Sequence, residues 1–331
     1  MRRLFLHIGY PKTGTTSLQR FLAANEVALA ARGVLYPQTG RWRDAQYGMN
    51  FALGLGAYDR PAELPAATPA EIAAGLAAEV EASGCERIVV SSEYFAIASV
   101  PDRAKVQALF AGYDVKIVCY LRRHDDALES AYAQAVKSVT DPPWQTNAES
   151  YVLHELGLGT VSYDYLAMLR QWGMRFGQGS VIVRPYEWAQ NQPDIQADFL
   201  RVIGVEDDPG FVRPPAANPS IGPRTAAAIH MVRRTGLPDE AKRHMVGRLI
   251  MADARAPSRA HFLPAVQRMS LVRRHLHMYR VIAKEFLDQE APLFTAPLPD
   301  DTDECQLESG FTHDALVETM LRALVPVPDG A

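Results

Sequence analysis

Three residues of types that could take part in group transfer, Lys12, Glu93 and Arg122, each come shortly after an apolar run. These runs have the length and the continuous apolar character of buried parallel strands. In an open α/β sheet, the carboxyl ends of the strands form the ligand crevice. We therefore expect an ammonium group, a carboxylate and a guanidinium group at one edge of one sheet. Such a set could hold an anionic donor and accept a proton from an acceptor.

The segment around Lys12 has the form of an anion-binding loop. An apolar run over residues 3–9 leads into a loop over residues 9–17, and helical spacing follows. The backbone N–H groups of such a loop and the N-terminus of its helix can hold a phosphate. In nucleoside triphosphate sites a Lys follows the second Gly, and the next hydroxyl residue binds Mg²⁺. Here Thr15 follows Gly14 and the Lys lies inside the loop, which argues against a metal-dependent kinase. The alternative is a Gly-rich turn that only begins a helix.

The stretch from Pro11 to Ser17 resembles the 5′-phosphosulfate loop of the sulfotransferases that use 3′-phosphoadenosine 5′-phosphosulfate (PAPS). The resemblance implies that PAPS is the co-substrate, that adenosine 3′,5′-bisphosphate is the product, and that no metal is required. It also implies that Lys12 is catalytic and lies beside the oxygen that bridges phosphorus and sulfur. The residues that would hold the donor here are Pro11, Lys12, Thr13, Gly14, Thr15, Thr16 and Ser17.

A second motif resembles the 3′-phosphate site of the same family, in which an Arg ends a strand and a Ser lies eight residues later. Arg122 and Ser130 have this spacing. An Arg at a strand end offers a planar fork of donors to a phosphate, and a Ser in the next helix can donate its hydroxyl. The 3′-phosphate is the group that separates PAPS from ATP. Without the first loop, Arg122 and Arg123 would be interpreted as surface residues balanced by Asp125 and Asp126.

Transfer to a hydroxyl requires a group that accepts the acceptor's proton. Glu93 follows the second apolar run and resembles the catalytic Glu of the carbohydrate-type branch of the family. No His in the sequence is placed equally well, since His7 lies within the first run and His124 follows two arginines. A partly buried Glu with a raised pKa would suit this role. The alternative is a structural Glu that caps the next helix or pairs with an Arg.

Strand and helix signals alternate as far as residue 215. This pattern predicts a three-layer α/β fold like that of the P-loop NTPases, with a central parallel sheet of four to five strands and a C-terminal helical extension. A helix is expected from Thr15 to Arg32. The expected strands cover residues 3–9, 87–92, 115–121 and 180–184. The predicted parts are a sulfotransferase core over 1–215, a helical extension packed on it over 216–290, and an acidic tail over 291–331.

Two loop-like segments are expected to shape the acceptor site, because loops above strand ends commonly do so. They cover residues 37–70, rich in Gly, Pro and Ala, and residues 139–160. A third segment, from Asn218 to Ser220, resembles the Asn/Ser stretch that opens the C-terminal helical part of some bacterial relatives. The resemblance implies a bacterial protein and a segment that lies near the nucleotide. Its alternative interpretation is a helix N-cap at Ser220.

Composition excludes several classes of function. A formal net charge of -4 gives no global basic field, so no nucleic-acid partner is expected. The apolar runs are too short to form a transmembrane segment. The three cysteines are widely spaced and form no CxxC pair, so neither a disulfide framework nor a metal site is expected. These features favour a cytoplasmic location.

Together these observations predict a sulfotransferase that transfers a sulfuryl group from PAPS to a hydroxyl, or to an amine, of a small-molecule or glycan acceptor by in-line attack. A carbohydrate or glycolipid is the first expectation. The Gly-rich C-terminal nucleotide segment of the cytosolic aryl and steroid enzymes is not recognisable here, so the carbohydrate-type branch is nearer. Two alternatives are a catalytically inactive protein that binds PAPS or the bisphosphate, and a P-loop small-molecule kinase. The oligomeric state is open, and a homodimer is one possibility.

Overall fold

The structure is a computed structural model that divides into two compact units. The first unit comprises Met1–Arg122, Ser162–Pro215 and Leu276–Ala296. The second comprises Arg123–Val161, Ala216–His275 and Pro297–Ala331. The two units are defined by contacts between residues, whereas the three predicted parts are defined by sequence pattern. The boundaries of those parts stay a prediction. The structure describes residues 1–55, 59–96, 100–139, 142–144, 147–158, 163–215, 220–255, 258, 260–307 and 310–324.

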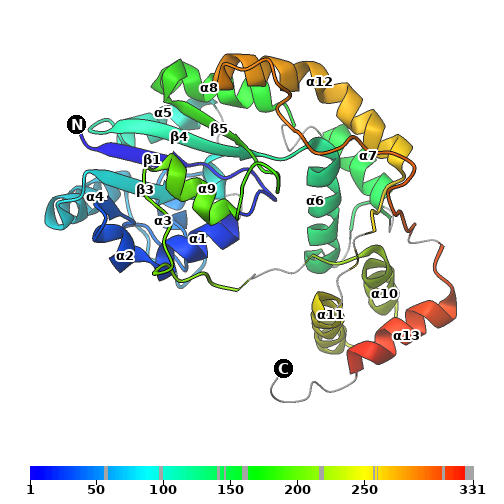
Figure 1. Cartoon of the computed structure of the whole chain (residues 1–331). Helices are drawn as coiled ribbons and strands as arrows, with labels where there is room; N and C mark the ends of the chain where they lie inside the picture. Colours follow the sequence, from blue (N-terminus) through cyan, green and yellow to red (C-terminus); the bar gives the residue numbers. More distant parts are fainter. Residues whose placement is uncertain are drawn as a thin grey trace. The chain divides into compact units, whose positions relative to one another are not determined.

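The first unit is built on a five-stranded sheet in the order β2–β3–β1–β4–β5, with every neighbouring pair parallel (Figure 1). The predicted α/β fold with a central parallel sheet is therefore confirmed. β1 is the middle strand, so the loop that follows it lies between the loops that follow β3 and β4. The strands are β1 (Arg3–His7), β2 (Val34–Leu35), β3 (Arg87–Ser91), β4 (Asp114–Leu121) and β5 (Val181–Pro185).

Both faces of this sheet are covered by helices, which explains why its strands are continuous apolar runs. Phe5 of β1 and Val89 of β3 belong to one core cluster with residues of α1, α2 and α9. On the other face α8 packs against β4 and β5, and α5 packs against α8 (Figure 1). These helices are α1 (Thr15–Ala24), α2 (Glu26–Ala30), α5 (Val100–Leu109), α8 (Tyr165–Phe176) and α9 (Ile195–Val202).

The prediction of a single helix over residues 15–32 was wrong. The segment forms two helices, α1 and α2, with Asn25 between them. The Asn25 amide donates to the backbone oxygen of Val212 at 2.7 Å and accepts from the Val212 N–H at 2.7 Å. An Asn side chain that satisfies a distant backbone segment competes with helical continuation. The segment predicted as irregular over 37–70 was wrong in part, since it contains α3 (Tyr47–Ala52) and the start of α4 (Pro69–Ser83).

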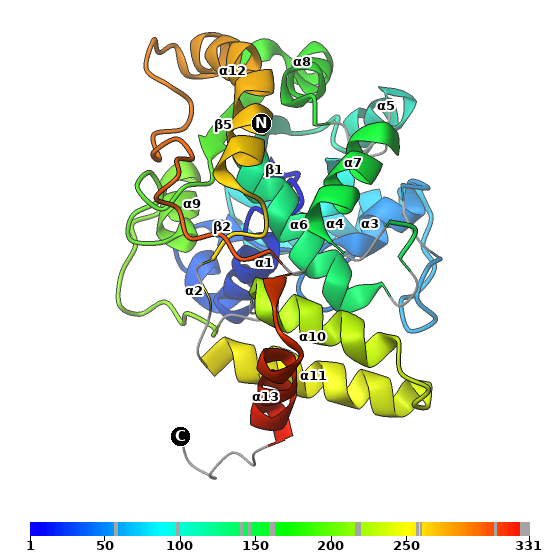
Figure 2. The same ribbon diagram turned by 90° about the vertical axis from the view of Figure 1, so that its right-hand side faces the viewer.

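The second unit is helical, in agreement with the predicted C-terminal extension. Figure 2 shows α10, α11 and α13 side by side, and each contacts the other two. α12 (Ala265–Leu287) is continuous across the division between the units. The N-cap of α10 is Gly222, so the alternative of a cap at Ser220 was wrong, and Asn218 and Pro219 lie outside the described residues. The other helices are α6 (His124–Ser138), α7 (Ala148–Leu158), α10 (Pro223–Arg233), α11 (Asp239–Arg255) and α13 (His313–Leu324).

The structure gives the state of the cysteines and the character of the described helices. Cys85, Cys119 and Cys305 are all free thiols. None of the described helices combines the length and the apolar character needed to cross a membrane.

A buried carboxylate ties three elements of the first unit together. Asp198 of α9 is fully buried. It accepts the Tyr120 hydroxyl of β4 at 2.7 Å and the Arg184 guanidinium of β5 at 3.0 and 2.5 Å. A buried carboxylate is tolerated only when it is paired and hydrogen-bonded in this way. The network therefore fixes α9 across the edge of the sheet.

We predict that Asp198→Asn lowers the free energy of unfolding by about 3 kcal/mol, because it leaves the buried side of Arg184 without its counter-charge. Urea unfolding at neutral pH measures this loss. The matched control is Arg201→Ala, which removes a more exposed Arg whose Nη2 lies 3.6 Å from Asp198 and should cost about 1 kcal/mol or less. Equal losses in the two variants would contradict the assignment.

Candidate functional site

The candidate site lies at the carboxyl ends of β1, β3 and β4, all in the first unit. The order β3–β1–β4 places the loop after β1 between Glu93 and Arg122. Thr15 donates its hydroxyl to Glu93 Oε2 at 3.3 Å, and Arg122 Nη1 donates to the Lys12 carbonyl oxygen at 3.1 Å. A side chain that follows β3 and a side chain that follows β4 therefore contact the loop, one on each side. The structure brings Lys12, Glu93 and Arg122 together, while their catalytic and binding roles stay predictions.

The loop after β1 turns sharply through left-handed backbone conformations. Lys12 has φ +67° and Gly14 has φ +73°. The Thr13 hydroxyl donates to the carbonyl oxygen of Tyr10 at 2.6 Å, which holds the turn closed on itself. A side chain other than Gly is uncommon at such φ values and costs free energy there. The Lys12 conformation is therefore imposed by the loop, as is typical of functional turns.

The first turn of α1 points its N–H groups into this loop. Its N-cap is Gly14, which has no side chain to cap them, and the first helical hydrogen bond runs from the Leu18 N–H to the Gly14 oxygen at 3.1 Å. The N–H groups of the preceding residues in a first turn have no partner within a helix and carry a partial positive charge. Within this turn Thr15 is buried and Thr16 is exposed. The Ser17 hydroxyl accepts the Gln196 amide at 2.7 Å.

Two glycines of the loop are fixed by close packing. A Cβ on Gly9 would lie 2.7 Å from Thr15 Cγ2, and Gly9 has φ +49°. A Cβ on Gly14 would lie 3.0 Å from Cε2 of Tyr186, the residue after β5. A larger residue at either position would force the loop away from its neighbours. Tyr186 thus packs directly against the loop.

Glu93 begins a short 3₁₀ helix (η1, Glu93–Phe95) after β3. Burial of its carboxyl raises the pKa of Glu93 above the ordinary value, while the Thr15 hydrogen bond and the charge of Lys12 partly oppose this shift. A carboxylate with a raised pKa is a better proton acceptor. Glu93 is therefore chemically suited to act as a base at the edge of the loop.

Arg122 is held from several directions. Besides its bond to the Lys12 carbonyl, its guanidinium lies 5.7 Å from the centre of the Tyr186 ring. Its own carbonyl oxygen accepts the Tyr165 hydroxyl of α8 at 2.9 Å. Sequence reasoning missed Tyr165, because it lies 43 residues along the chain and no local pattern links it to the loop. These contacts orient a cation beside the start of α1.

Ser130 belongs to α6 in the second unit and is partly exposed. Arg122 ends the segment Met1–Arg122 of the first unit, so the two residues belong to different units. A joint role for Arg122 and Ser130 therefore stays a prediction.

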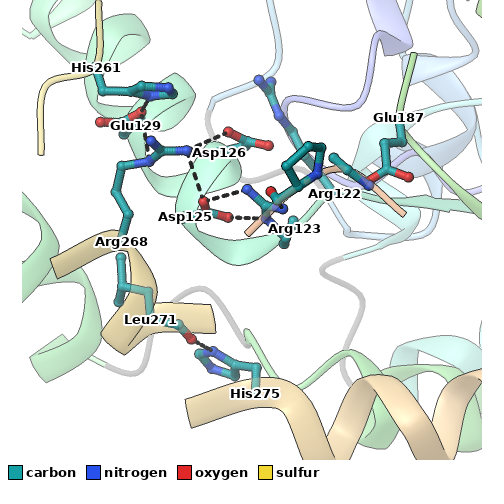
Figure 3. A network of polar contacts seen from close by, with 12 residues as sticks. Arg122, Arg123, Asp125, Asp126, Glu129, Glu187, His261, Arg268, Leu271 and His275 are labelled. Carbon is teal, nitrogen blue, oxygen red and sulfur yellow. Dashed lines mark hydrogen bonds and ion pairs between the residues drawn. The ribbon is translucent and has the colours of Figure 1, made fainter. Parts of the chain in front are cut away.

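Arg123, by contrast, is taken up by a polar cluster in the second unit. It is buried, and its guanidinium donates to both carboxylate oxygens of Asp125 at 2.8 and 2.9 Å (Figure 3). Arg268 donates to the same carboxylate at 3.3 Å and to Asp303 at 2.8 Å. A paired, buried guanidinium of this kind organises structure. Asp125 is thus the counter-charge of Arg123, whereas the side chain is buried and not at the surface.

The same cluster contains the three side chains Asp126, Glu129 and His261, whose ligand-type atoms all lie within 4.8 Å of one another. The Arg268 guanidinium lies 4.0 Å from both Asp126 and Glu129 (Figure 3). The Glu129 carboxylate also contacts His261 Nδ1 at 2.6 Å, which raises the pKa of His261. A cation supplied by the protein already neutralises this group, so we assign no metal to it.

Comparison with known proteins gives limited information. No protein-family model matches the chain. Over 135 residues, or 40% of its length, the chain is 32% identical to an uncharacterized protein of Archaeoglobus fulgidus. It spans about a third of that relative, since the match covers 34% of the archaeal protein. A crystal structure of a sulfotransferase from Alicyclobacillus acidocaldarius aligns with 75% of this chain and 96% of its own, at 18% identity and a TM-score of 0.40. A likeness at this level does not establish the activity of the present chain.

The raised pKa of Glu93 predicts a pH-dependent stability. The folded chain binds the Glu93 proton more tightly than the unfolded chain, so this contribution is full below the unfolded pKa and is lost as the pH rises through the folded pKa. The side chain introduced by Glu93→Gln stays neutral at every pH. At pH values above the folded pKa of Glu93, where the wild-type carboxyl is ionised, we expect the variant to melt at a higher temperature than the wild type. Thermal melts from about pH 4 to about pH 8 test this. The exposed control Glu63→Gln should show no such gain, and a Glu93→Gln variant that loses stability most at high pH would contradict the shift.

Proposed function

We propose that this chain transfers a sulfuryl group from PAPS to a hydroxyl of an acceptor. The observation that carries the proposal is the start of α1, which has no capping side chain and is bracketed by Glu93 and Arg122. An anion cradle, a candidate base and an oriented cation are the parts that sulfuryl transfer from an anionic donor requires. The proposal extends to the roles of the individual residues.

The loop fits the 5′-phosphosulfate end of the donor. The N–H groups of the first turn, with the hydroxyls of Thr15 and Thr16, are proposed to hold the 5′-phosphate. A Cβ on Gly14 would meet Tyr186, so only Gly lets the backbone approach its surroundings this closely here. Lys12, held at φ +67°, is proposed to stabilise the charge on the leaving phosphate oxygen. No residue of this loop takes the place of the Lys of a triphosphate site, since that position is Thr15.

The 3′-phosphate is proposed to bind Arg122, and the sequence spacing alone makes Ser130 its predicted second ligand. The contacts of Arg122 with the Lys12 carbonyl and the Tyr186 ring support this assignment, because they orient its remaining donors. Recognition of a 3′-phosphate would select PAPS over ATP. The proposed reaction has no metal requirement.

The reaction is a single displacement at sulfur. The acceptor oxygen attacks the sulfur, a new oxygen–sulfur bond forms, and the bond between sulfur and the 5′-phosphate oxygen breaks. Glu93 accepts the proton of the acceptor hydroxyl, so a sulfate ester and adenosine 3′,5′-bisphosphate leave the site. Preorganised charges act where the negative charge develops, on the leaving oxygen. Lys12 and the N–H groups of α1 are proposed to do this.

The proposal includes a cellular setting. The free thiols Cys85, Cys119 and Cys305 are compatible with a reducing cytoplasm. A carbohydrate or other small-molecule acceptor, no nucleic-acid partner, and a homodimer as one possible assembly complete the proposal.

We predict that Lys12→Ala lowers kcat for sulfuryl transfer on the order of a hundredfold or more, because it removes a preorganised charge from the leaving oxygen. Transfer is measured with radiolabelled PAPS and a panel of hydroxyl acceptors. Lys105→Ala, which removes an exposed Lys of α5, serves as the control and should leave the rate unchanged. A Lys12→Ala variant with wild-type kcat would remove the basis of the assignment.

A second substitution distinguishes loss of the base from loss of donor binding. Glu93→Gln should bind adenosine 3′,5′-bisphosphate as the wild type does, yet lose on the order of a hundredfold to ten-thousandfold in kcat, because a neutral amide cannot accept the proton. Binding is measured by calorimetry and transfer with the labelled donor. Unaltered transfer would mean that another residue is the base. Bisphosphate binding by the wild type without transfer to any acceptor would instead favour an inactive binding protein.

A further inference from the structure

Four aromatic side chains form a continuous patch beside Glu93. We name Trp42, Tyr47, Phe51 and Tyr94 the aromatic patch. The centroids of Trp42 and Tyr47 lie 6.2 Å apart, those of Tyr47 and Tyr94 5.2 Å apart, and those of Tyr94 and Phe51 6.0 Å apart. Trp42 and Tyr47, at 68°, and Tyr94 and Phe51, at 83°, meet edge to face, and the Tyr47 and Tyr94 rings are tilted by 54°. The patch therefore joins the segment before α3, α3 itself and η1 in the first unit.

Every ring of the aromatic patch is partly open to solvent. Tyr47 and Phe51 are four residues apart, so they share one side of α3. The residues between them, Gly48, Met49 and Asn50, are buried. The helix thus buries these three residues and leaves its two aromatic side chains partly exposed. Aromatic side chains are large apolar groups, and a contiguous set left in contact with water marks a ligand or partner site.

The aromatic patch adjoins the candidate base. Tyr94 is the next residue after Glu93 in η1. Helix α3, which carries Tyr47 and Phe51, packs against η1, which carries Glu93 and Tyr94. An acceptor whose hydroxyl reaches Glu93 must place the rest of its atoms on neighbouring surface. The aromatic patch is that kind of surface on the side of η1 and α3.

The chemistry of the aromatic patch is mixed rather than purely apolar. Two of its four members are tyrosines, which carry a hydroxyl on an apolar ring. Arg43 is exposed, has φ +56°, and holds its guanidinium 4.4 Å from the centre of the Trp42 ring. A sugar ring matches this combination. Its C–H bonds, which are positive at hydrogen, pack on the negative face of an aromatic ring, and its hydroxyls exchange hydrogen bonds with tyrosine and arginine groups.

Resting on the sulfotransferase function proposed above, we propose that the aromatic patch holds the ring of a saccharide acceptor and presents one of its hydroxyls to Glu93. The cation at Arg43 further favours a sugar that carries a negative charge, such as a uronic acid. A phenolic acceptor is the competing small molecule, because it would use the aromatic faces but not the hydrogen-bonding groups.

The test uses the full chain, labelled PAPS and three acceptors: methyl glucoside, methyl glucuronide and phenol. Trp42→Ala and Tyr94→Ala should each raise KM for both glycosides on the order of tenfold, the size of one aromatic contact. Bisphosphate affinity should stay at the wild-type value. Arg43→Ala should reduce the preference for glucuronide over glucoside on the order of fivefold. Trp188→Ala, which removes a Trp that is 74% exposed outside the aromatic patch, is the matched control and should change none of these values.

A measurement on the wild type avoids the risk that a variant fails to fold. Saturation-transfer NMR, with irradiation of the aromatic protons and methyl glucoside as the ligand, should saturate the C–H protons of one sugar face most strongly. Wild-type KM in Trp42→Ala and Tyr94→Ala, or transfer to phenol in preference to both glycosides, would overturn the saccharide assignment while the sulfotransferase function stands. If the wild type fails to bind the bisphosphate at all, the proposed function itself fails, and the assignment of the aromatic patch falls with it.

Discussion

The candidate site depends on one constraint: helix α1 is the next element after the central strand, and it starts with no side chain to cap it. Its N-cap is Gly14 at φ +73°, and a Cβ there would meet Tyr186. A first turn without a cap needs acceptors from elsewhere, and an anion is a favourable one. The contacts of Glu93 with Thr15 and of Arg122 with Lys12 then follow from the strand order, since β3 and β4 flank β1.

The two flanking contacts have different electrostatic consequences. Arg122 adds a positive charge beside the N-terminus of α1, in the same sense as the helix dipole. Glu93 is negative when ionised, but burial raises its pKa and so favours its neutral form. A site that combines a fixed positive field with a proton acceptor of raised pKa can hold an anion and still take up a proton. Neither property would arise from the loop alone.

The sequence predicted what depends on local pattern. The strands over 87–92 and 115–121 and the turn before Thr15 could be read from apolar runs and from Gly spacing, and the structure has them within a residue or two. What it could not predict depends on distant partners. Asn25 breaks a helix because its amide reaches Val212, and Tyr165 supports Arg122 from another helix. The aromatic patch likewise forms only when α3 packs against η1. No pattern within residues 37–70 predicts this packing.

The most direct measurement is calorimetric titration of the wild-type chain with nucleotides, once in the presence of EDTA and once in the presence of Mg²⁺. The account predicts one-to-one binding of adenosine 3′,5′-bisphosphate, much weaker binding of adenosine 5′-monophosphate, which lacks the 3′-phosphate, and no requirement for Mg²⁺. Magnesium-dependent binding of ATP with no binding of the bisphosphate at about millimolar concentration would contradict it.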